Sequence, residues 1–426
     1  MTRKGGRALH LMNIRTETLG RLLLSTLLVV TIVGHLSATQ SAATEYGTAA
    51  SISLRETYDD NVFLRGDSDF IHEVTPSLAL GAVSDRAEFQ VAASYDVSRY
   101  QDHDELNTVD QFYQLLTSFA ATPRLSFALV GTFVIDYTFR YALEVEGARA
   151  NRNQRHVADA RPSMRYELGP RDSIEIAYSP YMVEYHRSDS DRRDYKGHDV
   201  NLGWIHDLKN ERTTLGLLIG ADQTDYDDNQ DNPDEEIRDR TVRTSASVQH
   251  KFSETTTVEA GAGVRFTDSR VHDGESSTDQ TAGFVGNFVL TQRFERATVV
   301  ARLNRSYSPS TFGEGATRDS ARLNVHYRLI ERLGCSLGTA IRQIKTEREE
   351  QEDRESRAFS VTPGVAYRLT ESLRLELGYS FYRVDNQTTD ETDSRNRVWL
   401  GLTWNIIEPE WRIRSPRPLV EWPYRD

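Results

Sequence analysis

The chain has 426 residues, of which 64 are Asp or Glu and 51 are Lys or Arg, giving a net charge of −13 at pH 7. No run of Lys or Arg is long enough to follow a phosphate backbone, so the sequence argues against a nucleic-acid partner. The one cysteine, Cys335, rules out an intramolecular disulfide and any metal site made of several cysteines.

The first 43 residues have the order of a secretory signal peptide. Basic residues precede the apolar run Leu22–Val33, and small side chains follow at Ser41, Ala42 and Ala43. This order predicts export with cleavage after Ala43. The alternative is a retained anchor helix, but the apolar run is shorter than the roughly 20 residues that a spanning helix needs.

From residue 44 to residue 406, short turn signals recur along the chain. They lie at residues 84–86, 122–124, 169–171, 209–211, 253–255, 295–296, 331–332 and 370–372. Longer polar connections lie near residues 59–68, 101–109, 140–152, 188–194, 226–237, 272–277, 309–316, 348–353 and 386–393. Short and long connections therefore alternate, and they divide this segment into about eighteen strands of about 12 to 17 residues each.

Within these strands, apolar and polar residues alternate. Leu373, Leu375 and Leu377 fall on one face of their strand, while Arg374 and Glu376 fall on the other. A β-propeller places four short strands in each repeat, and a soluble sandwich does not need loops of alternating length. An outer-membrane barrel requires an even strand number, short periplasmic turns, longer outer loops, an apolar lipid face and a polar lumen. The sequence therefore predicts an all-β, antiparallel, up-and-down transmembrane β-barrel of about eighteen strands.

The last predicted strand alternates through Val398, Leu400, Leu402, Trp404 and Ile406. This pattern resembles the closing-strand signal that the barrel assembly machinery reads, although that signal normally ends the chain in an aromatic residue. Residues 407–426 instead continue with several prolines. Because proline cannot donate to a strand ladder, we expect a periplasmic tail, with a segment folded against the lumen as the alternative.

The polar faces of the strands predict what lines the lumen. In the second half of the chain they carry mostly basic side chains. The candidate lumen residues are Arg243, Arg265, Arg302, Arg322, His326, Arg328, Arg342, Arg374 and Arg397. A wall rich in arginine favours anionic solutes or anionic sugar chains. The alternative is charge compensation across a partly blocked lumen.

Aromatic and acidic residues suggest less specific roles. Tyr382, Trp399 and Phe112 would stack on sugars if they lie in the channel, or else belong to the aromatic girdles at the membrane surfaces. The acidic loop 225–236 resembles a calcium-binding loop but has Gln230 in place of the required glycine, so we interpret it as a hydrated loop. No Gly-x-Ser-x-Gly elbow is present. We predict no catalytic residues, no metal site, no cofactor and no enzymatic activity.

The start of the mature chain carries a family resemblance. The stretch LRETYDDNVFL contains Tyr58, Asp60, Asn61 and Val62, and a proline-containing second strand follows it. In this it resembles the beta-barrel porin 2 family, whose members begin with a strand ending in a Tyr-x-Asp-Asn-hydrophobic motif. The resemblance implies an outer-membrane β-barrel, and several relatives are associated with exopolysaccharide export. We expect Asp60 and Asn61 to hydrogen-bond the backbone where the first strand ends.

These observations predict a protein of the Gram-negative outer membrane with three segments: a signal peptide at residues 1–43, a barrel at 44–406 and a tail at 407–426. Its expected partners are outer-membrane lipid and lipopolysaccharide, the barrel assembly machinery, and a polysaccharide or small anionic solute. The expected function is passive export of a polysaccharide. The alternatives are a general diffusion porin and a non-conducting structural or adhesive surface barrel.

Overall fold

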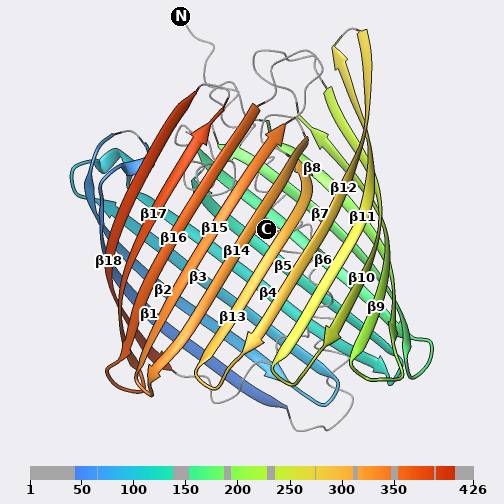
Figure 1. Ribbon diagram of the computed structural model, residues 1–426, viewed down its shortest axis with the longest axis horizontal. Coiled ribbons are helices and arrows are strands. Elements are labelled where there is room, and N and C mark those ends of the chain that lie inside the picture. The colour runs from blue at the N-terminus through green and yellow to red at the C-terminus, as the bar shows by residue number, and fades with distance from the viewer. Residues whose placement is uncertain are drawn as a thin grey trace, which may run out of the picture.

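The computed structural model describes residues 44–64, 66–137, 153–186, 193–227, 236–273, 275–309, 315–346, 354–387 and 390–407. The predicted signal peptide, the tail from residue 408 and most of the longer connections lie outside these ranges. Eighteen strands account for nearly all of the described residues (Figure 1). They are β1(Glu45–Asp59), β2(Asp69–Val83), β3(Ala87–Tyr100), β4(Thr108–Thr122), β5(Leu125–Tyr137), β6(Gln154–Glu167), β7(Asp172–His186), β8(Tyr195–Asp207), β9(Thr213–Tyr226), β10(Glu236–Lys251), β11(Thr256–Asp273), β12(Glu275–Arg293), β13(Ala297–Pro309), β14(Gly315–Ile330), β15(Leu333–Thr346), β16(Arg354–Arg368), β17(Leu373–Asn386) and β18(Glu391–Ile407).

The strands form one closed sheet. Each strand pairs antiparallel with its neighbours in sequence, and β1 pairs with both β2 and β18. The closing pair runs from Asp59 opposite Arg397 to Ala50 opposite Ile407, with a register shift at Ala50. The predicted antiparallel, up-and-down barrel of eighteen strands is therefore confirmed. Closure matters because it leaves no sheet edge for hydrocarbon to meet.

The eight predicted short turns connect β2–β3, β4–β5, β6–β7, β8–β9, β10–β11, β12–β13, β14–β15 and β16–β17. They all lie at one end of the barrel, called here the short-turn end, and the other connections lie at the long-loop end. One predicted long connection, residues 272–277, is wrong. There β11 and β12 continue to Asp273 and Glu275, which pair directly. Polar residues can extend a hairpin beyond the apolar part of the wall, and this hairpin projects past the other strands at the upper right of Figure 1.

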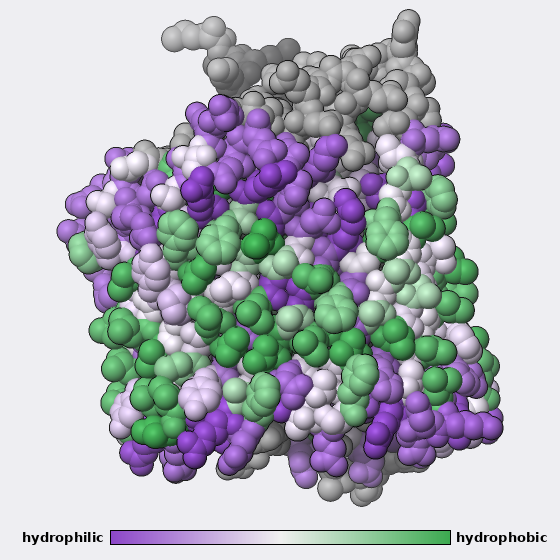
Figure 2. All heavy atoms as spheres, in the orientation of Figure 1, coloured by the Kyte–Doolittle hydropathy of each residue, from purple (hydrophilic) through white to green (hydrophobic). Residues whose placement is uncertain are grey.

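The outer face of the wall carries the apolar side chains. Figure 2 shows them gathered in a band across the middle of the barrel, with hydrophilic residues above and below it. Residues of this apolar belt are more than a third exposed and include Leu80, Val200, Leu202, Leu217, Ile219, Val242, Phe284, Leu303, Leu377 and Leu400. The opposite parity of each strand faces inward. Exposed aliphatic side chains around a closed sheet are typical of a barrel that meets lipid.

The described part of the chain contains two short 3-10 helices, η1(Val62–Leu64) and η2(Asp104–Leu106), both at the long-loop end. No helix among the described residues is long and apolar enough to span a membrane. Val62 and Leu64 are each 1% exposed, because they pack with Ile71, Tyr100 and Leu106. Val384 of β17 completes this cluster, called here the mouth cluster, and Tyr137, Ala358 and Tyr382 pack against it. The connection after β1 therefore folds inward and covers part of the barrel's mouth.

Candidate functional site: an arginine-lined lumen

The lumen contains a cavity of about 830 Å³. Its lining comes from β5 to β14 and mixes aliphatic, amide, hydroxyl and charged side chains. Seven arginines outnumber four aspartates in this lining. The arginines are Arg155, Arg161, Arg243, Arg265, Arg302, Arg318 and Arg322, and the aspartates are Asp159, Asp199, Asp222 and Asp239. Two of these arginines, Arg155 and Arg161, are paired with Asp136 and Glu175, which lie outside the lining, and the other five outnumber the four aspartates by one.

The candidate lumen residues predicted from the sequence fall into two groups. Arg243, Arg265, Arg302 and Arg322 line the cavity, and Arg322 also borders a smaller hollow of about 340 Å³ together with His326.

The other predicted arginines lie away from the cavity. Arg328 donates to the carbonyl oxygen of Glu295 at 3.1 Å, at the short-turn end. Arg374 lies 3.6 Å from Glu376 on the same strand. Arg342 and Arg397 stand on the inward parity of β15 and β18. The structure thus brings only four of the nine predicted side chains into one cavity.

These four arginines form two directly opposed pairs. Arg243 of β10 stands opposite Arg265 of β11, and Arg302 of β13 stands opposite Arg322 of β14. Like charges directly opposite each other in antiparallel strands are destabilising. Arrangements that cost stability are typical of functional sites.

Partners on the same strand or two strands away hold the first pair in place. Arg243 contacts Asp199 and donates to Asn201 Oδ1 at 2.8 Å. Arg265 lies with its guanidinium carbon 3.6 Å from the centre of the Tyr307 ring and donates to Thr267 Oγ1 at 3.0 Å.

Two glycines on adjacent strands give these arginines room. A Cβ atom at Gly220 would lie 2.9 Å from Arg243 Nε, and one at Gly283 would lie 2.8 Å from Arg265 Nε. Both glycines stand directly opposite the arginine that they accommodate. The guanidinium groups therefore lie flat along the wall.

Sequence reasoning missed the residues contributed by β6 to β9. Arg155 is held by Asp136, with Nε to Oδ1 at 2.9 Å and Nη2 to Oδ2 at 2.6 Å. Tyr181 donates to Asp222 Oδ2 at 3.2 Å. The alternation of Gly220, Asp222 and Thr224 could have indicated an inward-facing row of residues. It was hard to recognise because apolar and polar residues mix on both faces of these strands.

Tyrosines rise from the cavity toward the long-loop end. The rings of Tyr181 and Tyr195 are 6.4 Å apart, and those of Tyr195 and Tyr226 are 5.5 Å apart. The three aromatic residues singled out in the sequence do not belong to this group. Tyr382 packs on the mouth cluster, Trp399 lies against Gly378, and Phe112 is an exposed belt residue on the outer parity of β4.

The family-motif residues lie where the barrel closes. Asp60 accepts hydrogen bonds from the backbone and side-chain nitrogens of Asn396, both at 2.6 Å. Asn61 donates to the carbonyl oxygen of Ser394 at 2.7 Å and accepts from the backbone N–H of Gly66 at 2.7 Å. Tyr58 faces outward and is 42% exposed. The motif thus connects β1 to β18 and shapes the loop that carries η1.

A charged contact fixes the next connection at the long-loop end. Asp69, which is 2% exposed, accepts from the backbone N–H groups of Gln101, Asp102 and His103, and its Oδ2 is 3.0 Å from His103 Nδ1. Burial raises the pKa of the Asp69 carboxyl, but the hydrogen bonds from Asp102 and His103 outweigh it and hold the pKa below its usual value. The same hydrogen bond raises the pKa of His103 against the opposing effect of burial, and the charge of Asp69 adds to the increase.

Within the described ranges, no group of three His, Cys, Asp or Glu side chains is arranged to hold a metal ion. Most of the acidic loop 225–236 lies outside those ranges.

Comparison with known proteins gives no family for this chain. No family model matches the sequence, and no curated protein matches it. Solved structures that resemble it are outer-membrane proteins. The ferric citrate transporter FecA has 10% identity and a TM-score of 0.47, with 86% of this chain and 79% of that chain covered. The outer membrane protein OpdK from Pseudomonas aeruginosa has 11% identity and a TM-score of 0.44, with 84% and 99% covered. The alcaligin receptor FauA from Bordetella pertussis has 10% identity and a TM-score of 0.45, with 86% and 76% covered. The assignment as a barrel therefore rests on the strand pairing of this chain itself.

Proposed function

We propose that this protein is a channel of the Gram-negative outer membrane whose lumen favours anionic solutes. The proposal rests on two pairs of directly opposed arginines in one lumen cavity, Arg243 with Arg265 and Arg302 with Arg322. A solute anion beside these side chains would relieve their mutual repulsion. The side chains of the first pair need no rearrangement to meet it, because Asp199, Asn201, Thr267 and Tyr307 already hold their guanidinium groups.

The membrane location follows from the outer face of the barrel. An apolar belt on a closed antiparallel sheet matches a lipid bilayer, and short turns at one end with longer connections at the other match the periplasmic and outer sides. Lipid and lipopolysaccharide are then the immediate partners of the belt, and assembly depends on the barrel assembly machinery.

A polysaccharide is the substrate class that we propose. An eighteen-stranded barrel is wide enough for an aqueous path, and the cavity offers both arginines and tyrosine rings. Tyr181, Tyr195 and Tyr307 line it together with amide groups. Aromatic faces and hydrogen-bonding side chains are the groups that hold sugar rings. The resemblance around Tyr58, Asp60 and Asn61 adds the expectation of an exopolysaccharide system.

Conductance in planar bilayers tests the proposal. The refolded barrel should form channels whose reversal potential in a salt gradient shows anion preference. Arg302→Glu combined with Arg322→Glu should shift that potential toward cation preference. The matched control is Arg240→Glu with Arg383→Glu, which makes the same change in total charge on outward-facing side chains and should leave the potential unchanged. A lumen variant that behaves like the control would remove the role proposed for the arginine pairs.

The second candidate function is that of a non-conducting barrel that serves as a surface structure. The mouth cluster favours it, because Val62 and Leu64 are buried beneath the long-loop end. Absence of conductance in the wild-type barrel and in a Val62→Asp/Leu64→Asp variant, which disrupts the cluster, would support this reading over the channel.

A further inference from the structure

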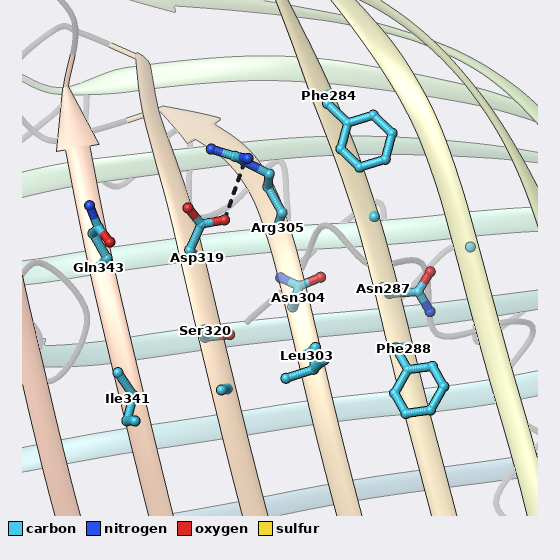
Figure 3. A pocket seen from close by; sticks show the side chains of 13 residues that line it. Phe284, Asn287, Phe288, Leu303, Asn304, Arg305, Asp319, Ser320, Ile341 and Gln343 are labelled. Atoms are coloured by element: carbon cyan, nitrogen blue, oxygen red, sulfur yellow. Dashed lines mark ion pairs between the residues drawn. The ribbon is translucent and has the colours of Figure 1, made fainter.

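The wall of the barrel is incompletely paired between β12 and β13. Their pairing begins at Arg293 opposite Thr298 and ends at Gly286 opposite Arg305. Toward the long-loop end, residues 275–285 of β12 pair with β11, and residues 306–309 of β13 pair with β14. Among these described residues, no pairing joins the two strands above Gly286 and Arg305. Figure 3 shows β13 bending away from β12 above Arg305.

A cavity of about 520 Å³ lies at this point of the wall. On its outer side are the belt residues Phe284, Leu303 and Ile341 together with Phe288, and on its lumen side are the amides of Asn287 and Asn304 (Figure 3). Both amides, together with Leu303 and Ser320, also line the lumen cavity. Inner and outer spaces therefore share four lining residues, which lie just below the last pair of β12 and β13, Gly286 opposite Arg305.

A charged pair on the outer face shows where this opening lies relative to the membrane. Arg305 Nε lies 3.2 Å from Asp319 Oδ1, and both side chains are more than 40% exposed. Ion pairs are costly in the hydrocarbon of a bilayer, so this pair marks the level of the lipid headgroups. Unpaired backbone groups are also excluded from hydrocarbon. The open part of the seam begins at the same level, where polar groups can satisfy the strand edges.

The lumen side of the seam is spanned by side chains. Arg265 of β11 reaches past β12 to Thr317 of β14, with Nη2 to Oγ1 at 3.4 Å, and lies over the ring of Tyr307 on β13. Below this bridge, the buried Oδ1 of Asn304 has no hydrogen-bond partner among the described residues. A buried acceptor of this kind is satisfied when a donor such as a hydroxyl group enters.

We infer that the β12–β13 seam is a lateral portal that connects the lumen with the outer leaflet for a single-chain amphiphile with a hydroxylated headgroup. The alkyl chain lies along Phe288 and the belt residues Leu303 and Ile341. The headgroup passes between the unpaired edges and donates a hydrogen bond to Asn304 Oδ1. The inference uses the membrane-embedded barrel of the proposed function but does not require conduction of a free solute.

Reaction of engineered cysteines tests the portal in proteoliposomes, in a Cys335→Ser background. The probe is a hexadecyl glycoside whose sugar carries a maleimide, and a water-soluble maleimide serves to report folding and lumen access. Asn304→Cys places the thiol on the lumen side of the seam. Asn287→Cys does so from the opposite strand, in case the first variant fails to fold. Thr132→Cys on β5 is the matched control, because it lines the same cavity beside fully paired strands.

All three thiols should react with the water-soluble maleimide. The lipid-borne reagent should label Asn304→Cys and Asn287→Cys at least tenfold faster than Thr132→Cys. Equal rates at the seam and at β5 would overturn the portal, and so would the absence of lipid-borne labelling at the seam. The absence of labelling is also the result expected if another copy of the chain pairs with the open edges. Conductance of the same vesicles separates the two ideas, because channels without seam labelling refute the portal alone, and labelling without channels refutes only the channel.

Discussion

The buried ion pair between Asp59 and Arg395 should be the most sensitive contact of the closing seam. Asp59 is fully buried, and Arg395 Nε lies 2.7 Å and 3.0 Å from its two carboxylate oxygens. Replacing Arg395 by Met leaves the Asp59 charge buried without its guanidinium partner. Breaking a buried pair from one side costs about 3–5 kcal/mol, whereas replacing both partners by apolar residues of similar volume is often neutral. We therefore expect Arg395→Met to lower the free energy of unfolding by about 3–5 kcal/mol and Asp59→Leu/Arg395→Met to restore most of it.

Urea-induced unfolding in lipid vesicles, followed by tryptophan fluorescence, measures both values. Both variants lack Arg395 and its packing. The difference between their free energies of unfolding therefore reports the cost of leaving the Asp59 charge buried without a partner. The reasoning fails if the two variants unfold with free energies equal to within about 0.5 kcal/mol, the scatter expected for independent sites. Channel recordings add a functional readout, because the pair lies beside the loop that carries Val62 and Leu64. Arg395→Met should loosen the mouth cluster and increase the conductance.

Gly220→Ala places a Cβ 2.9 Å from Arg243 Nε and should destabilise the barrel by about 1–3 kcal/mol through overpacking, whereas Gly169→Ala, with open space around its Cβ, should change the unfolding midpoint little. The Asp69–His103 contact should depend on pH. The stability contributed by the raised pKa of His103 is complete below about pH 6.5 and is lost as the pH rises through the folded pKa, while that from Asp69 is present above about pH 3.9 and is lost as the pH falls. Protection of the amides of Gln101 to His103, corrected for intrinsic exchange, should therefore peak between about pH 4 and 6.5, and Asp69→Asn should abolish the peak.

The barrel was predictable because its signals are local. Period-two alternation and short turn signals need only a few residues each, and they located all eight tight turns and the inward parity of Arg243, Arg265, Arg302 and Arg322. The hairpin at Asp273 and Glu275 was missed for the same reason, since its polar residues read locally as a loop but pair as strands outside the apolar belt.

Contacts between distant segments could not be read from the sequence. The opposition of Arg302 and Arg322 depends on the register between two strands, and a shift of one residue would send a side chain to the other face. The ion pair between Asp59 and Arg395 joins residues that are 336 positions apart in the sequence. The inward fold of Val62 and Leu64 depends on apolar partners from β2, β3 and β17, which no local pattern identifies.

The two halves of the lumen differ, and this difference constrains any route through the barrel. The mouth cluster gathers side chains from β2, β3 and β17 with both 3-10 helices, and Ala358 of β16 and Tyr137 of β5 pack against it. The cavity and its arginines instead lie along β5 to β14. A solute entering from the short-turn end would therefore follow the arginine side as far as Tyr181. Beyond it, a second buried cluster is formed by Val183, Tyr185, Tyr195, Tyr226 and Ile237. The incompletely paired seam opens on that same side, so an amphiphile passing through it would reach the lumen beside Arg302 and Arg322 without crossing the mouth cluster.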